Sequence, residues 1–189
     1  MFMNKQEFIK KYNLKELTTN DGICIDLMYA TTNNFTHQKL YNDTTCLLRK
    51  NTAKKLLKAN KELLQYGYKI KIWDAFRPIK VQEKMWDLFP DENFVTNPKN
   101  GKSNHCKASA IDMTLCTLDN KDIPMPTEFD HFGIESYRNY YPNLPINIQE
   151  KVILLENIMK ENGFNSLPTE WWHFNDIDNY DIIDEIYDN

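Results

Sequence analysis

Residues 103–115 read SNHCKASAIDMTL, a polar run that carries His105 and then becomes a strand pattern with Asp112 in its middle. An ionised carboxylate between Ile111 and Met113 is unfavourable to bury unless it is paired or binds a cation. If both apolar neighbours face the core, Asp112 points to solvent from the other face of the strand. The spacing alone leaves a solvated aspartate and a metal ligand equally open.

A second motif, EWWHF, begins at Glu170 and contains His173. Residues three apart point to opposite faces of a regular strand, so we expect Glu170 at the start of the strand or in a bulge. A lone histidine here would be a core residue held by a hydrogen bond. Together, however, His105, Asp112 and His173 supply three ligands with a fourth position open, as in catalytic zinc sites. Glu170 is then available as the base that activates the zinc-bound water.

The third motif is WDAFRP, residues 73–78, at the end of a predicted strand. Arg77 has two ordinary interpretations: a solvated surface arginine, or a structural ion pair with Asp74. Amide hydrolysis offers a third, because the oxyanion that develops needs a fixed positive partner and arginine supplies one.

Hydrophobic spacing around these motifs predicts one α+β domain over residues 1–189, without repeats or a linker. A polar loop is expected over 91–104, and long loops in compact domains are often functional. A short helix carrying Val81, Met85 and Leu88 should end at Pro90. The other expected elements are strands at 23–29, 68–73, 110–115 and 170–174 and helices at 49–66 and 148–162.

Composition excludes several classes of protein. The chain has 189 residues, 41% of them hydrophobic and 26% charged, a globular profile rather than a disordered one. Its net charge of −4 argues against nucleic acid as a partner. No signal-peptide pattern and no membrane-spanning stretch is evident. The four cysteines form no C-x-x-C pair, so we expect free thiols and a cytoplasmic location.

In order and spacing, DAFRP, SNHCKASAID and EWWH resemble the signatures of VanX-type D-alanyl-D-alanine dipeptidases. That family belongs to a group of zinc peptidases with D-Ala-D-Ala carboxypeptidases and the hedgehog signalling domain. The similarity covers roughly residues 21–175. It implies the hedgehog/DD-peptidase-like fold, a central antiparallel sheet with flanking helices.

The resemblance also implies roles for individual residues. Its zinc ligands, one ion per chain, fall on His105, Asp112 and His173, its catalytic base on Glu170 and its transition-state arginine on Arg77.

Three further residues match substrate-binding positions of the family, with ordinary interpretations left open. Asp130 and Ser103 match groups that anchor the free amino end of the substrate, although Asp130 also suits a loop or helix cap and Ser103 a turn. Asp74 is grouped with them and is expected to orient Arg77. The chain departs from the family at Ala108, where a glycine is usual, at a cost of about 1 kcal/mol if a positive φ is required.

The function implied is hydrolysis of a small free dipeptide, D-alanyl-D-alanine or a related D-dipeptide, with no membrane and no obligate protein partner. Two alternatives remain: a murein D,D-carboxypeptidase or peptidase of the same group, and a zinc-binding domain without catalysis. His37 and His131 match no ligand position and are expected at the surface or beside the site.

Overall fold

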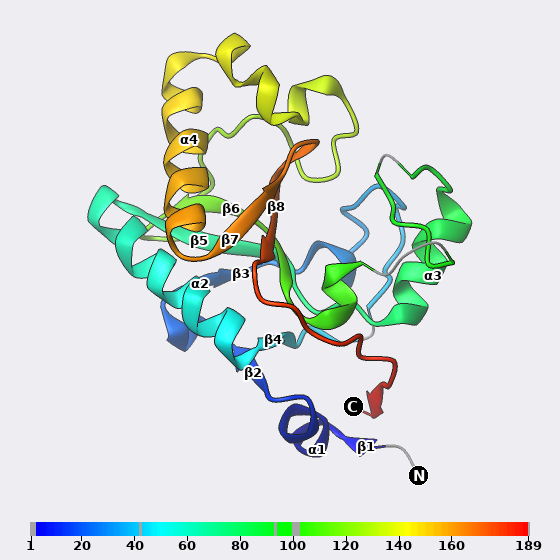
Figure 1. Cartoon of the computed structure of the whole chain (residues 1–189). Helices are drawn as coiled ribbons and strands as arrows, with labels where there is room; N and C mark the ends of the chain where they lie inside the picture. Colours follow the sequence, from blue (N-terminus) through cyan, green and yellow to red (C-terminus); the bar gives the residue numbers. More distant parts are fainter. Residues whose placement is uncertain (1–2, 42, 93, 100–102, 189) are drawn as a thin grey trace.

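A five-stranded sheet runs through the middle of the molecule (Figure 1). The computed structural model describes residues 3–41, 43–92, 94–99 and 103–188. Adjacent strands are antiparallel, except that β3 runs parallel to β5, so the predicted α+β fold with a mainly antiparallel central sheet is confirmed. The strand order is β3 (Cys24–Ile25), β5 (Tyr68–Asp74), β6 (Ala110–Thr117), β8 (Glu170–Asp176) and β7 (Phe164–Leu167).

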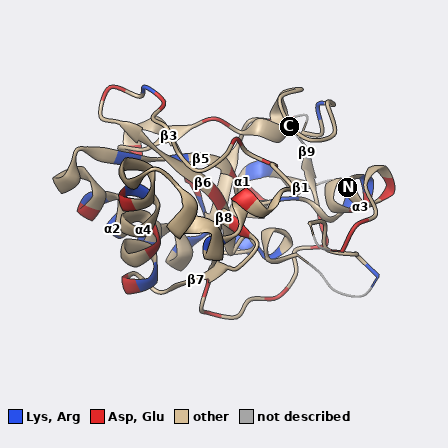
Figure 2. Cartoon of the chain, turned by 90° about the horizontal axis from the view of Figure 1, so that it is seen from above, with Lys and Arg blue, Asp and Glu red and all other residues tan. Residues whose placement is uncertain are grey.

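Two long helices, α2 (Lys50–Leu63) and α4 (Ile146–Glu161), pack against each other and against the sheet, α2 on β5 and α4 on β7 (Figure 1). Helix α2 buries Ala53, Leu56 and Leu63 at the three- and four-residue spacing of one helical face. Figure 2 shows basic and acidic residues on both ribbons. These two helices cover one side of the sheet.

Shorter segments cover the other side of the sheet, where Figure 1 places helix α3 (Ile79–Leu88). A 3-10 turn, η4 (Asn104–Lys107), leads directly into β6, and another, η2 (Met28–Ala30), follows β3. The remaining 3-10 segments are η1 (Thr19–Asp21), η3 (Leu64–Tyr66), η5 (Ile134–Ser136) and η6 (Arg138–Asn143).

Segments near the two ends of the chain pair with each other, below the five-stranded sheet in the view of Figure 1. Strand β1 (Met3–Asn4) pairs with β9 (Tyr187–Asp188), helix α1 (Lys5–Lys11) follows β1, and β2 (Leu14–Leu17) pairs with β4 (Cys46–Arg49). A second apolar cluster, separate from the main core around the five-stranded sheet, joins these elements to the turn before β6; its buried members are Phe8, Leu14, Leu47, Phe76, Ala108 and Ile183. Nothing in the sequence had indicated these pairings.

Most predicted elements are confirmed, but the strand expected over residues 23–29 is wrong in extent. Only Cys24–Ile25 is a strand, because the chain then turns into η2, with Ala30 N–H donating to the Leu27 carbonyl at 3.0 Å. The turn buries the Tyr29 ring against Tyr41 and Phe129. Of the loop expected over 91–104, residues 93 and 100–102 lie outside the described part.

Cys24, Cys46 and Cys116 are free cysteines, as expected. Within the described residues, no helix combines the length and the apolar character that crossing a bilayer requires.

Candidate active site

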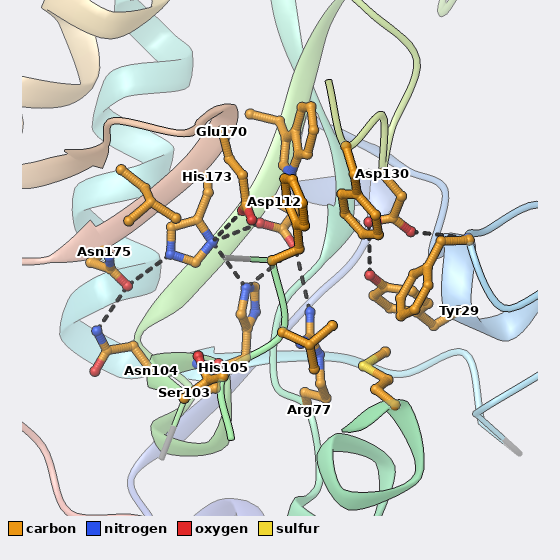
Figure 3. Close-up of a pocket in the computed structure, with 18 residues that line it drawn as sticks. Tyr29, Arg77, Ser103, Asn104, His105, Asp112, Asp130, Glu170, His173 and Asn175 are labelled. Atoms are coloured by element: carbon orange, nitrogen blue, oxygen red, sulfur yellow. Dashed lines mark hydrogen bonds and ion pairs between the residues drawn. The ribbon is translucent and has the colours of Figure 1, made fainter. Parts of the chain in front are cut away.

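A cavity of about 220 Å³ lies where β6 and β8 meet η4 (Figure 3). This volume is below the roughly 300–1,000 Å³ of drug-sized sites, so the cavity suits a small ligand. It brings together side chains that are far apart in the sequence. The expected site residues that line it are Arg77, Ser103, His105, Asp112, Asp130, Glu170 and His173.

Asp112 and His173 are directly opposite one another on β6 and β8, so their side chains leave the same face of the sheet. His173 Nδ1 lies 2.8 Å from Asp112 Oδ1, and His105 Nε2 lies 3.2 Å from Asp112 Oδ2 and 3.3 Å from His173 Nδ1. Asp112 is only 3% exposed, which excludes the solvated aspartate that the sequence had left open. Burial opposes ionisation, but the imidazoles of His105 and His173 hold the pKa of Asp112 below its usual range.

His105 reaches this position because the chain reverses between η4 and β6. The Ser103 hydroxyl caps η4 by accepting the His105 N–H at 3.3 Å. Ala108 then adopts the left-handed conformation, with φ of 56° and ψ of 35°. The positive φ that a glycine would favour is therefore present, at a cost of about 1–2 kcal/mol for alanine. Its methyl group is fully buried in the second apolar cluster.

The hydrogen bonds of the two imidazoles determine where their lone pairs point. His105 Nδ1 lies 2.8 Å from the Ala75 carbonyl, which can only accept, so Nδ1 carries the proton and Nε2 the lone pair. His173 Nε2 lies 3.0 Å from Asn175 Oδ1, and Asn104 Nδ2 donates to that same oxygen at 2.9 Å. His173 Nε2 is therefore the donor in its neutral form, and His173 Nδ1 has the free lone pair.

Two imidazole lone pairs and a carboxylate thus converge on one buried point. This arrangement is favourable only if the three groups share a proton or bind a cation. Two nitrogens with one carboxylate are a ligand set that zinc and other divalent transition metals accept. Among the described residues, His105, Asp112 and His173 form the one group of three such side chains placed to hold a metal ion, and their ligand atoms all lie within 4.8 Å of one another. The residues present fit a metal ion.

Glu170 lies beside this group, with Oε2 3.8 Å from His173 Nδ1. It is the first residue of β8, and the β7–β8 register shifts at Leu167, so the expectation of a strand start or a bulge is confirmed. Burial raises the pKa of Glu170 to about 8, and the charges of Asp112 and Asp130 contribute. A carboxyl group of that kind is suited to accept and return a proton near neutral pH.

Arg77 is buried and held in place by neighbouring side chains. Asp74 Oδ2 accepts from Arg77 Nε at 2.9 Å and Nη2 at 2.7 Å, and Gln82 Oε1 accepts from Nη1 at 2.8 Å. Tyr41 donates to the other Asp74 oxygen at 2.5 Å. Arg77 is 8% exposed, which excludes the surface arginine. Asp74 is fully buried behind it and does not line the cavity, so its position suits orientation of Arg77.

Asp130 lies on the opposite wall of the cavity from His173 in Figure 3. It occupies a turn and caps no helix. Its carboxylate accepts from the Tyr29 hydroxyl at 3.0 Å and from the Phe35 N–H at 3.3 Å. Burial raises the pKa of Asp130 to about 7, and the charge of Asp112 adds to the effect.

Sequence reasoning missed the residues that orient these groups. Asn175 was detectable, because it follows His173 by two positions on the same strand and so shares its face. Tyr29 and Gln82 come from other segments and have no local signal. His37 is exposed and His131 contacts Glu135 at 3.1 Å, so both lie outside the site, as expected.

Comparison with known proteins agrees with this geometry. A family model described as Peptidase_M15, D-ala-D-ala dipeptidase, matches residues 11–189. The chain belongs to this family. It is 35% identical over 150 residues to the D-alanyl-D-alanine dipeptidase of Escherichia coli (strain K12), covering 79% of this chain and 77% of that protein. It is 29% identical to the enzyme of the same name from Enterococcus faecium, with 89% and 90% covered.

Proposed function

We propose that this protein is a zinc-dependent dipeptidase that hydrolyses free D-alanyl-D-alanine or a closely related D-dipeptide. The observation that carries the proposal is the convergence of His105, His173 and Asp112 beside Glu170 in one small buried cavity. The substrate and its stereochemistry are inferred from the names of the relatives.

Zinc is the metal we infer, because two imidazoles and one carboxylate leave a fourth position open, as in catalytic zinc sites. A zinc ion bound there would supply a Lewis acid for the scissile carbonyl and lower the pKa of a bound water. The protein's contribution is to fix the three ligands: the Ala75 carbonyl orients His105, and Asn175 orients His173.

Glu170 is the proposed general base. Its carboxylate accepts a proton from the attacking water and then donates that proton to the nitrogen of the leaving amine. Its position close to His173 Nδ1 supports this role. Burial supports it further, because a carboxyl group with a pKa of about 8 holds a proton more readily than a solvated one.

Arg77 is the proposed partner of the oxyanion. Within the described part of the chain, Asp74 and Gln82 occupy three of its five N–H donors, which leaves one on Nη1 and one on Nη2, and Nη2 also faces Asp112 Oδ2 at 3.5 Å. A guanidinium fixed in this way stabilises developing negative charge without reorganising during the reaction.

The free amino end of the substrate is the proposed ligand of Asp130, with Ser103 as a second proposed contact from another part of the cavity wall. A carboxylate that two donors already hold in place presents its charge to an ammonium group. The stacked rings of Phe94 and Phe132, with centroids 4.4 Å apart, enclose the same cavity. A cavity of about 220 Å³ favours a free dipeptide over polymeric cell wall. The cytoplasmic location and the independence from a protein partner stay predictions.

The substrate proposal is tested by incubating the purified protein with D-Ala-D-Ala, L-Ala-L-Ala and N-acetyl-D-Ala-D-Ala, with zinc and with a chelator. We expect release of D-alanine from the free D-dipeptide alone, lost with the chelator and restored by zinc. Equal cleavage of the acetylated peptide would indicate a carboxypeptidase instead. A zinc-loaded protein that cleaves none of the three would indicate a binding domain.

The role of Glu170 is tested by Glu170→Gln, which keeps the shape of the side chain but removes its basicity. We expect unchanged zinc content and a kcat lower by about 10²–10⁴-fold, the usual contribution of a general base. Glu150→Gln, at an exposed glutamate of α4, is the matched control and should behave as wild type. Near-normal turnover in Glu170→Gln would remove the proposed mechanism.

We expect activity to fall at acidic pH, because only the ionised form of Asp130 attracts the ammonium group of the substrate. As the pH falls, Glu170, with a pKa of about 8, gains a proton first and Asp130, with a pKa of about 7, gains one next, so kcat/KM should fall below about pH 8 and more steeply below about pH 7. Tyr29→Phe removes a donor that stabilises the carboxylate. We expect the pKa of Asp130, and with it the steeper lower part of the acidic limb, to rise by about one unit.

The control for this prediction is Tyr66→Phe, at an exposed tyrosine, which should leave the pH profile of kcat/KM unchanged. An acidic limb that stays in place or moves to lower pH in Tyr29→Phe would show that Asp130 does not set it.

A further inference from the structure

The hairpin of β7 and β8 is irregular at the point where the site residues occur. Leu167 pairs with Glu170 and the next pair is Ser166 with Phe174, so one step along β7 spans four residues of β8. Residues 171–173 are therefore outside the β7–β8 register, with Glu170 at one border of the irregular stretch. This irregularity lets Glu170 and His173, three apart, lie beside the same cavity. Backbone carbonyls in such a bulge need donors other than the neighbouring strand.

Arg138, the first residue of η6, supplies those donors. Its Nη2 donates to the Glu170 carbonyl at 3.1 Å and to the His173 carbonyl at 2.9 Å, and its Nε donates to the Leu167 carbonyl at 2.8 Å. Its own backbone N–H donates to the Pro168 carbonyl at 2.9 Å. One side chain thus links both ends of the irregular stretch.

The other half of the guanidinium is anchored as well. Arg138 Nη1 donates to the Tyr141 hydroxyl at 2.9 Å and to Glu156 Oε2 at 3.1 Å. All five N–H donors therefore have acceptors. The guanidinium carbon lies 4.7 Å from the centre of the Phe174 ring, and the side chain is 9% exposed. A buried, fully bonded fork of this kind has one orientation, which a lysine cannot reproduce.

We propose that Arg138 is a positioning residue that fixes Glu170 relative to His173 by holding their two backbone carbonyls on one nitrogen. It does not line the cavity and so acts through the backbone alone. The inference rests on the proposed function for its catalytic consequence. Its effect on His173 as a metal ligand is measurable without any turnover.

The test compares Arg138→Lys and Arg138→Met with wild type. Mutation of a residue that holds a metal ligand in place typically lowers metal affinity or activity by 10–100-fold. We therefore expect the affinity of both Arg138 variants for zinc to fall by about that factor. The visible absorption of the cobalt-substituted protein should change, because His173 is a ligand. With saturating zinc, kcat should fall by about 10²-fold, the effect of a displacement near 1 Å, while KM changes much less, because Asp130 and Arg77 are untouched.

Lys55→Met is the matched control. Lys55 also pairs with buried β8, through Asp176 at 2.6 Å, but at the far end from Glu170. The Lys55→Met substitution should lower Tm but leave zinc affinity, the cobalt spectrum and kcat as in wild type. If neither Arg138 variant folds, the Tyr141→Phe/Glu156→Gln double variant decides. It keeps Arg138 but weakens its anchors, and it should shift the cobalt spectrum and lower zinc affinity.

A folded Arg138→Lys protein with wild-type zinc affinity, cobalt spectrum and kcat would overturn the inference. If the single variants do not fold, a Tyr141→Phe/Glu156→Gln protein with wild-type zinc affinity and cobalt spectrum would overturn it as well. Failure of the proposed function looks different: the wild-type protein would cleave no dipeptide, while the Arg138 variants would still change zinc affinity and the cobalt spectrum.

Discussion

Three electron-pair donors face one another in a buried space: Nε2 of His105, Nδ1 of His173 and the carboxylate of Asp112. Without a positive charge among them, their mutual repulsion and the loss of hydration would be unfavourable. The rest of the site follows from this constraint. Hydrogen bonds to Ala75 and Asn175 aim the lone pairs inward, and Arg77 places a second positive charge 3.5 Å from Asp112.

The backbone is irregular where it supplies these groups. Ala108 takes a left-handed conformation that turns His105 back over β6, and the β7–β8 register shift brings Glu170 beside His173. Each irregularity is supported from outside the cavity: Ala108 by the apolar cluster that the chain ends complete, and the bulge by Arg138. Backbone strain of this kind persists where surrounding contacts over-determine it.

The sequence predicted what local patterns encode. The helical spacing of α2 and the apolar run of β6 gave correct elements, and the three-residue separation of Glu170 and His173 correctly indicated an irregular strand. It could not predict pairings between short strands far apart in the chain, such as β1 with β9, which have no periodic signal. Arg138 was missed for a related reason, because it lies 32 residues before Glu170 and only tertiary structure brings them together.

The central claim is that these three electron-pair donors hold one metal ion. It is tested most directly by growing crystals with zinc and measuring anomalous differences on both sides of the zinc absorption edge. We predict one zinc peak about 2.0–2.2 Å from His105 Nε2, His173 Nδ1 and an Asp112 oxygen. A crystal with zinc only elsewhere, and with Asp112 turned to Arg77, would contradict the claim.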